Sequence, residues 1–148
     1  MGGGSPREEP LALSTLIASD SIQVGARAED WRAAVRVSGD ALVASGATSP
    51  AYTSEMIATV EQLGPYIVIA PGIALAHSRP SPAVHRAGIS LVTLARPVKF
   101  GHQQNDPVQL VIGLAAPDDE GRRTALLAAP DPAAIRRMIG DYEGGMAT

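Results

Sequence analysis

One segment of the sequence brings together side chains that could handle a phosphoryl group. His77, Ser78 and Arg79 follow one another within Pro71–Pro82 (PGIALAHSRPSP), directly after a β-branched run. A neutral imidazole can accept a phosphoryl group on one ring nitrogen while a hydrogen bond holds the other. Arginine offers a fork of donors to phosphate oxygens, serine offers a hydroxyl, and small residues let the backbone approach an anion. The segment therefore predicts a nucleophilic histidine, although a solvated turn is the commoner origin of such a short pattern.

The other two histidines, His85 and His102, lie in separate segments. No histidine has the spacing of a metal ligand pair and no carboxylates cluster with one, so we expect no metal site and no cofactor. Within Phe100–Pro107 (FGHQQNDP), Asp106 is expected to cap the backbone N–H groups of a tight turn. An approach of His102 to His77 is the less favoured alternative, and His85 is expected at the surface near the start of a strand.

Nearly continuous apolar runs predict the sheet that positions the histidine segment. They are Tyr66–Ala70 (YIVIA), Ile89–Leu94 (ISLVTL) and Val108–Leu114 (VQLVIGL). Such runs are typical of strands buried on both faces. Ser21–Gly25 alternates and predicts a shorter strand. The segment Pro71–Pro82 itself is expected to be a loop.

Helical periodicity occupies the remaining segments. Ala28–Ser45 repeats apolar residues at three- and four-residue steps, has two acidic residues in its first turn, and should stop at Gly46. Pro50–Leu63 follows a Ser49 cap and should end at a glycine, and Pro132–Tyr142 closes the chain. This order predicts the α/β class, with a mixed β-sheet flanked by helices on both sides. The second helix is expected to bury Tyr52, Met56, Ile57 and Val60.

The composition limits the function further. The 148 residues predict a flexible leader over 1–10 and a single domain over 11–148. A net charge of −3 and 3% aromatic residues give no reason to expect nucleic acid. The absence of cysteine excludes disulfides and thiol nucleophiles. No apolar stretch reaches the roughly 20 residues that span a bilayer, and the leader has no apolar signal segment, so we expect a cytoplasmic protein.

Three longer strings resemble a known family. Gly64–Pro80 (GPYIVIAPGIALAHSRP), Gly88–Gly101 (GISLVTLARPVKFG) and Asn105–Ala116 (NDPVQLVIGLAA) resemble the mannitol/fructose-type enzyme IIA domains of bacterial sugar phosphotransferase systems. They are most similar to the ascorbate-specific branch, and the resemblance covers about residues 11–142. It implies the enzyme IIA mannitol-type fold and a phosphotransferase. In that relay, HPr phosphorylates the histidine of a GIA-x-x-H motif, here His77, and a cysteine of enzyme IIB accepts the phosphate for sugar that crosses through enzyme IIC.

The chain departs from the family pattern at two places. Ala76 stands where the family usually has proline before the histidine. Around Arg122, either this arginine replaces a second family histidine or most of the helix that carries it is absent. Arg122 could still join Ser78 and Arg79 in binding phosphate, and a missing helix would expose apolar surface that a homodimer could hide. The leading interpretation is a phosphoryl carrier, and the alternative is a regulatory binding module with the same fold.

Overall fold

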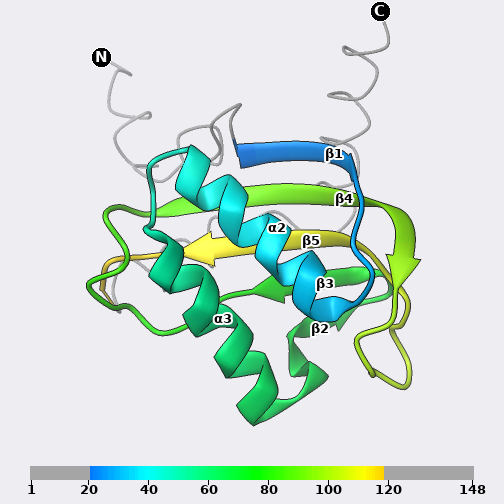
Figure 1. Cartoon of the computed structure of the whole chain (residues 1–148). Coiled ribbons are helices and arrows are strands. Elements are labelled where there is room, and N and C mark those ends of the chain that lie inside the picture. The colour runs from blue at the N-terminus through cyan, green and yellow to red at the C-terminus, as the bar shows by residue number, and fades with distance from the viewer. Residues whose placement is uncertain (1–20, 119–148) are drawn as a thin grey trace, which may run out of the picture.

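The computed structural model describes residues 21–118, which form a mixed sheet with two α-helices on one face (Figure 1). Within this part of the chain the strand order is β1-β4-β5-β3-β2. β1 and β4 are parallel, as are β3 and β5, whereas β4–β5 and β2–β3 are antiparallel. In chain order the elements are β1 Ile22–Ala26, α2 Trp31–Ala44, α3 Pro50–Leu63, the 3-10 helix η3 Pro65–Ile67, β2 Val68–Ala70, β3 Ile73–Ala76, β4 Gly88–Val98 and β5 Val108–Ala115.

Both helices begin and end close to where the sequence predicts. The carboxylate of Asp30 accepts a hydrogen bond of 2.9 Å from the N–H of Ala33, so this acidic residue caps α2 and does not lie in its first turn. After α2, Gly46 has φ +87° and its N–H donates to the carbonyl of Val43 at 2.9 Å. A second bond runs from the next N–H to the carbonyl of Leu42, which completes a Schellman motif. The Asp30 cap and the Gly46 turn therefore set the two boundaries of α2.

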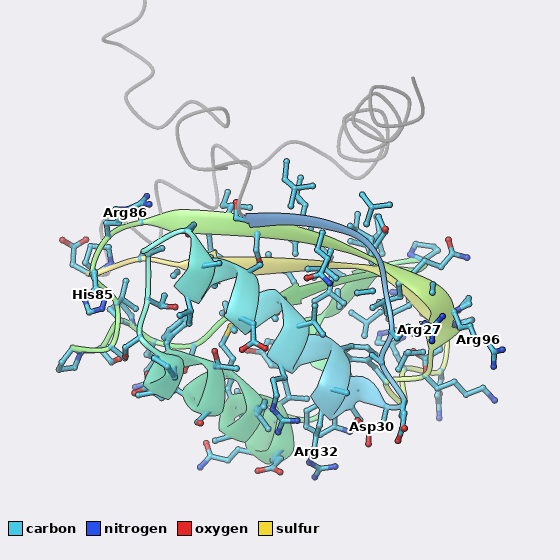
Figure 2. All side chains as sticks on the ribbon, turned by 45° about the horizontal axis from the view of Figure 1, so that its top comes forward. Arg27, Asp30, Arg32, His85, Arg86 and Arg96 are labelled. Carbon is cyan, nitrogen blue, oxygen red and sulfur yellow. The ribbon has the colours of Figure 1, made fainter. Side chains whose placement is uncertain are left out.

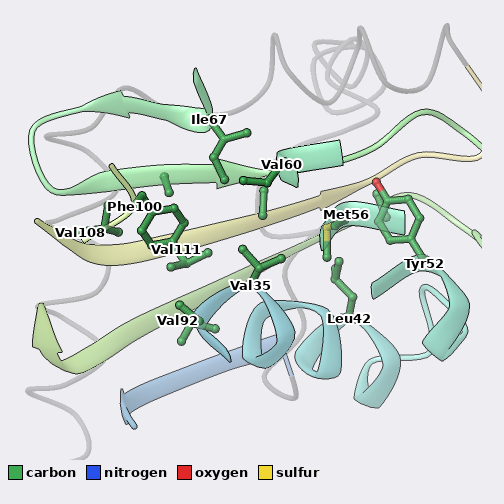
Figure 3. Packing of buried hydrophobic residues seen from close by; sticks show 14 of the residues in the cluster. Val35, Leu42, Tyr52, Met56, Val60, Ile67, Val92, Phe100, Val108 and Val111 are labelled. Atoms are coloured by element: carbon green, nitrogen blue, oxygen red, sulfur yellow. The ribbon is translucent and has the colours of Figure 1, made fainter. Parts of the chain in front are cut away.

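The helices pack on the sheet through one aliphatic cluster, shown in Figure 3. Tyr52, Met56 and Val60 of α3 are buried there as predicted, whereas Ile57 is only partly buried at the rim. Since neighbouring strand residues point to opposite faces, β4 and β5 also supply a second buried cluster on the other face. That second cluster contains Ile73, Ile89, Leu91, Leu110, Ile112 and Leu114.

The two clusters bury both faces of the sheet, which confirms the prediction of strands buried on both faces. The described helices α2 and α3 cover the first face. The predicted leader 1–10 and the predicted helix over 132–142 lie outside the described residues. The predicted mixed α/β sheet is confirmed.

Two predictions around the histidine segment were wrong. Tyr66–Ala70 is not one buried strand: η3 takes its first half, β2 its second, and Ile69 is 52% exposed. β2 lies at the edge of the sheet, and its successive side chains point to opposite faces, so that Val68 is buried and Ile69 is exposed. The segment predicted as a loop contains β3, which is inserted between β5 and β2. Its alanines Ala74 and Ala76 are fully buried in the cluster under the helices, so their small size serves packing.

Candidate active site

His77 directly follows the last residue of β3, and its ring orientation is fixed by its own backbone. Nδ1 lies 3.0 Å from the carbonyl oxygen of Leu75. A carbonyl oxygen can only accept, so this hydrogen bond requires the proton on Nδ1. In the neutral ring the lone pair is then on Nε2. The strand end therefore presents a half-buried imidazole with Nε2 as its nucleophilic atom.

Tyr66 of η3 contacts that nucleophilic nitrogen. Its hydroxyl lies 3.4 Å from Nε2 of His77, and the two rings meet edge to face with centroids 6.0 Å apart. The phenol is 47% exposed, and 3.4 Å is long for a hydrogen bond, so the contact can break easily. The sequence analysis missed Tyr66 because it assigned this residue to a buried strand. The glycine and proline directly before Tyr66, Gly64 and Pro65, are turn residues that could have indicated an exposed segment at this position.

A surface pocket of about 530 Å³ lies beside the imidazole. His77, Ser78 and Arg79 all line this pocket, so the structure brings these three predicted residues together. Arg79 is exposed, and a guanidinium at a pocket rim can reach an anion that enters. The other lining residues come from the end of α3 and from η3: Thr59, Gln62, Leu63 and Tyr66.

Ser78 is held at both its backbone and its side chain. The hydroxyl of Tyr52 accepts a bond of 3.0 Å from the N–H of Ser78 and donates one of 2.7 Å to the carbonyl of Leu114. The hydroxyl of Ser78 lies 2.9 Å from that of Thr59. Both contacts connect the residue after the histidine to α3, and the first also connects it to β5. Thr59 is a second pocket residue that sequence reasoning missed.

The other histidines lie away from this pocket. The carboxylate of Asp106 accepts hydrogen bonds from the N–H groups of Phe100, Gly101 and His102, which confirms the predicted cap. Nδ1 of His102 accepts from two further N–H groups of the same turn. This turn precedes β5, which runs parallel to β3, so it lies at the opposite end of the sheet from His77. The alternative in which His102 approaches His77 was therefore wrong.

His85 is exposed and lies shortly before β4, as predicted. The predicted phosphate ligand Arg122 lies outside the described residues. Among residues 21–118 no three His, Asp or Glu side chains are grouped as they would be to hold a metal ion. None of the helices in this range combines the length and apolar character needed to cross a bilayer.

A larger hollow, of about 1000 Å³, lies between the loop after β1 and the end of β4. Figure 2 shows Arg27 and Arg96 there, at the end of the molecule opposite His85 and Arg86. Its lining mixes the cations Arg27, Arg96 and Lys99 with two carboxylates and contains no histidine. The smaller pocket at His77 is therefore the better candidate for chemistry.

The fold, with a histidine at the end of β3, defines the class of protein: an α/β domain of the enzyme IIA type. The mannitol-specific cryptic phosphotransferase enzyme IIA CmtB from Escherichia coli has this fold, with a TM-score of 0.71, 32% identity and 80% of each chain covered. Enzyme IIAMTL from Escherichia coli, solved in complex with phosphorylated enzyme IIBMTL, gives a TM-score of 0.62 at 28% identity over 71% of this chain and 74% of its own.

Sequence comparison then gives the family. The family model of the phosphoenolpyruvate-dependent sugar phosphotransferase system, EIIA 2, matches residues 15–132. The chain belongs to this family, so the resemblance seen in the sequence is confirmed. The ascorbate-specific PTS system EIIA component of Escherichia coli is 46% identical over 104 residues, which are 70% of this chain and 68% of that relative.

Proposed function

We propose that this chain is the phosphoryl carrier of a sugar phosphotransferase system and that His77 carries the phosphoryl group. HPr supplies the group, a cysteine of enzyme IIB accepts it, and the system takes up ascorbate or a related sugar through the membrane enzyme IIC. The observation that carries the proposal is the hydrogen bond between Nδ1 and the Leu75 carbonyl, which leaves the lone pair on Nε2 beside the pocket. The identity to an ascorbate-specific component supports the choice of sugar.

In the proposed transfer from phospho-HPr, one N–P bond forms and one N–P bond breaks. The Nε2 lone pair of His77 attacks phosphorus, the N–P bond of phospho-HPr breaks, and its electron pair returns to the HPr imidazole. Because Nδ1 keeps its proton, the phosphorylated ring of His77 carries positive charge and is a good leaving group for the next transfer. The thiolate of enzyme IIB then attacks the same phosphorus. The protein contributes positioning and charge stabilisation, which is most of what phosphoryl transfer requires.

Ser78 and Arg79 are the proposed phosphate ligands among the described residues. Both line the pocket beside His77, and Arg79 is exposed enough to follow an incoming phosphoryl group. Arg122 is proposed as a third ligand on the sequence alone. Ala76, which replaces the usual proline, is the last residue of β3 and is paired with Gly113 of β5. Strand pairing therefore fixes the backbone before His77 without a proline ring.

Exposed apolar side chains beside the pocket support protein partners. Among the described residues, the large hydrophobic side chains that stay exposed are Leu63 at 62%, Ile69 at 52% and Tyr66 at 47%. Leu63 and Tyr66 line the His77 pocket, and Ile69 lies on the adjoining edge strand. Apolar surface of this kind marks protein interfaces. We assign Leu63, Tyr66 and Ile69, called the apolar rim below, to the docking of HPr and enzyme IIB.

A mass measurement tests the proposal. The purified chain, incubated with phosphoenolpyruvate, enzyme I and HPr, should gain one phosphoryl group. His77→Ala should abolish the gain because no other described residue in the pocket lining carries an imidazole. His85→Ala is the matched control and should leave the gain unchanged, since that ring is exposed and outside the pocket. A wild-type chain that gains nothing with several HPr proteins, or a His77→Ala chain that still gains, would contradict it.

A further inference from the structure

Two hydroxyl groups meet in the pocket beside His77. Oγ1 of Thr59 lies 2.9 Å from Oγ of Ser78, and both residues line the pocket with the imidazole. Thr59 belongs to α3 and Ser78 to the segment after β3, so the tertiary fold creates this pair. Both side chains are partly buried, which protects their hydrogen bond from competition with water.

Counting protons gives the direction of this hydrogen bond. The hydroxyl of Thr59 also lies 2.9 Å from the backbone carbonyl of Glu55, to which it donates. A threonine hydroxyl has one proton, so that proton is committed to the carbonyl. The bond between the two hydroxyls must then use the proton of Ser78. In this arrangement Ser78 presents lone pairs to the pocket, and these would repel the oxygens of a phosphoryl group.

We propose that Thr59 is a positioning residue that turns Ser78 into a phosphate donor. When a phosphoryl group enters, Thr59 rotates its proton from the Glu55 carbonyl to Oγ of Ser78, and Ser78 rotates its own proton to a phosphoryl oxygen. No covalent bond changes; two hydroxyl groups rotate. The inference rests on the proposed function and adds Thr59 to its site.

The surrounding residues keep the free-energy cost of the rotation small and hold Ser78 where its hydroxyl can reach the pocket. The Glu55 carbonyl lies inside α3, where it remains an acceptor for the helix N–H four residues later after Thr59 turns away. The backbone of Ser78 is fixed by its N–H bond of 3.0 Å to the Tyr52 hydroxyl. Its side chain is therefore held between Thr59 and the pocket. A donor aimed at a charged oxygen is stronger than one aimed at a neutral carbonyl, which favours the rotated state once phosphate is bound.

The test compares two valine substitutions on the same helix. Thr59→Val keeps the shape of the side chain but removes its hydroxyl. Thr53→Val is the matched control, because Oγ1 of Thr53 is buried and has no hydrogen-bond partner within the described part of the chain. The measurement is the equilibrium constant for phosphoryl transfer from phospho-HPr, from the phosphorylated fraction by intact mass. We expect about a tenfold fall for Thr59→Val, no change for Thr53→Val, and recovery in Thr59→Ser.

A double-mutant cycle separates this role from a merely structural one. If Thr59 acts through Ser78, then Thr59→Val should have no further effect in a Ser78→Ala background. A full additional loss there would overturn the inference, as would a phosphorylated wild type whose equilibrium constant is unchanged by Thr59→Val. A wild type that takes no phosphoryl group at all overturns the proposed function, and the role of Thr59 with it. The free energy of unfolding of each variant shows whether it folds.

Discussion

Tyr52 joins the hydrophobic core to the site through a single hydroxyl group. Its ring is 1% exposed and packs in the cluster under the helices, with the hydroxyl oxygen at the edge of that cluster (Figure 3). The oxygen donates to Leu114 and accepts from Ser78 at the same time. A buried polar atom with both roles satisfied stabilises the fold, and here it also sets the backbone beside His77.

Replacing Tyr52 with phenylalanine should therefore destabilise the protein more than the same replacement at an exposed tyrosine. Tyr52→Phe leaves the Leu114 carbonyl and the Ser78 N–H without their partner, which we expect to lower the free energy of unfolding by about 1–3 kcal/mol. Tyr66→Phe removes an exposed hydroxyl whose contact with His77 is 3.4 Å long, and it should change the free energy of unfolding by less than about 0.5 kcal/mol. Chemical denaturation measures both. Equal losses in the two variants would refute the role given to Tyr52.

At the scale of elements, two glycines let α2 approach its neighbours. A Cβ on Gly39 would lie 2.3 Å from Oγ1 of Thr53, so α2 and α3 cross with no room for a methyl group. A Cβ on Gly113 of β5 would lie 2.3 Å from Oγ of Ser90. That serine donates to the carbonyl of Ser38 on α2, so the sheet is equally close to the helix. These contacts fix where α3 stands, and with it Thr59 beside the pocket.

Gly39→Ala tests the close crossing of α2 and α3. Helix propensity predicts that this substitution raises the free energy of unfolding, whereas packing predicts that it lowers it. In an uncrowded helix, alanine in place of glycine would stabilise by about 1 kcal/mol. Here the added methyl group must displace Thr53, and we expect a loss of about 1–3 kcal/mol in the free energy of unfolding. Thr53→Ala in the same chain should restore part of it, since the two residues touch. A stabilised Gly39→Ala variant in chemical denaturation would show that α3 can move away freely.

The elements that the sequence predicted well are those with local signals. Gly46, Pro50 and Gly64 mark the helix boundaries where they were expected, and long β-branched runs gave β4 and β5. β3 was missed because its small residues are also typical of a loop, and its pairing with β5 and β2 makes it a strand. His77 could be found from residue type. Thr59 and Tyr66 could not, since they reach it from other elements, and their contacts depend on how α3 and η3 pack.

At the scale of the whole molecule, the part that the structure describes, residues 21–118, has two unlike ends. One end carries His77 and its pocket, whose lining includes Leu63 and Tyr66, while Ile69 of the apolar rim lies along the edge strand β2 toward the β2–β3 turn. The other end carries the larger hollow with mixed charges around Arg27 and Arg96. A carrier must pass its phosphoryl group between two proteins through one histidine. Under the proposed function both partners would dock at the first end, and the second end is a natural place for control substitutions.

Ile69→Ser tests docking at the apolar rim. The side chain is more than half exposed, so its loss should leave the free energy of unfolding nearly unchanged. If it packs against a partner, the KM for phosphoryl transfer should rise roughly 5- to 30-fold, as for an interface side chain worth about 1–2 kcal/mol. Transfer should be timed in both directions, from phospho-HPr to the chain and from the phosphorylated chain to enzyme IIB.

The control for Ile69→Ser is Ala95→Ser, which changes an exposed apolar residue of β4 in the hollow at the other end. It should leave both KM values unchanged. If one histidine serves both transfers, as proposed, a partner cannot reach it without covering the surface next to it. Unchanged KM values for Ile69→Ser in both directions would mean that neither partner covers β2, and docking would then have to come from the α3 side of His77.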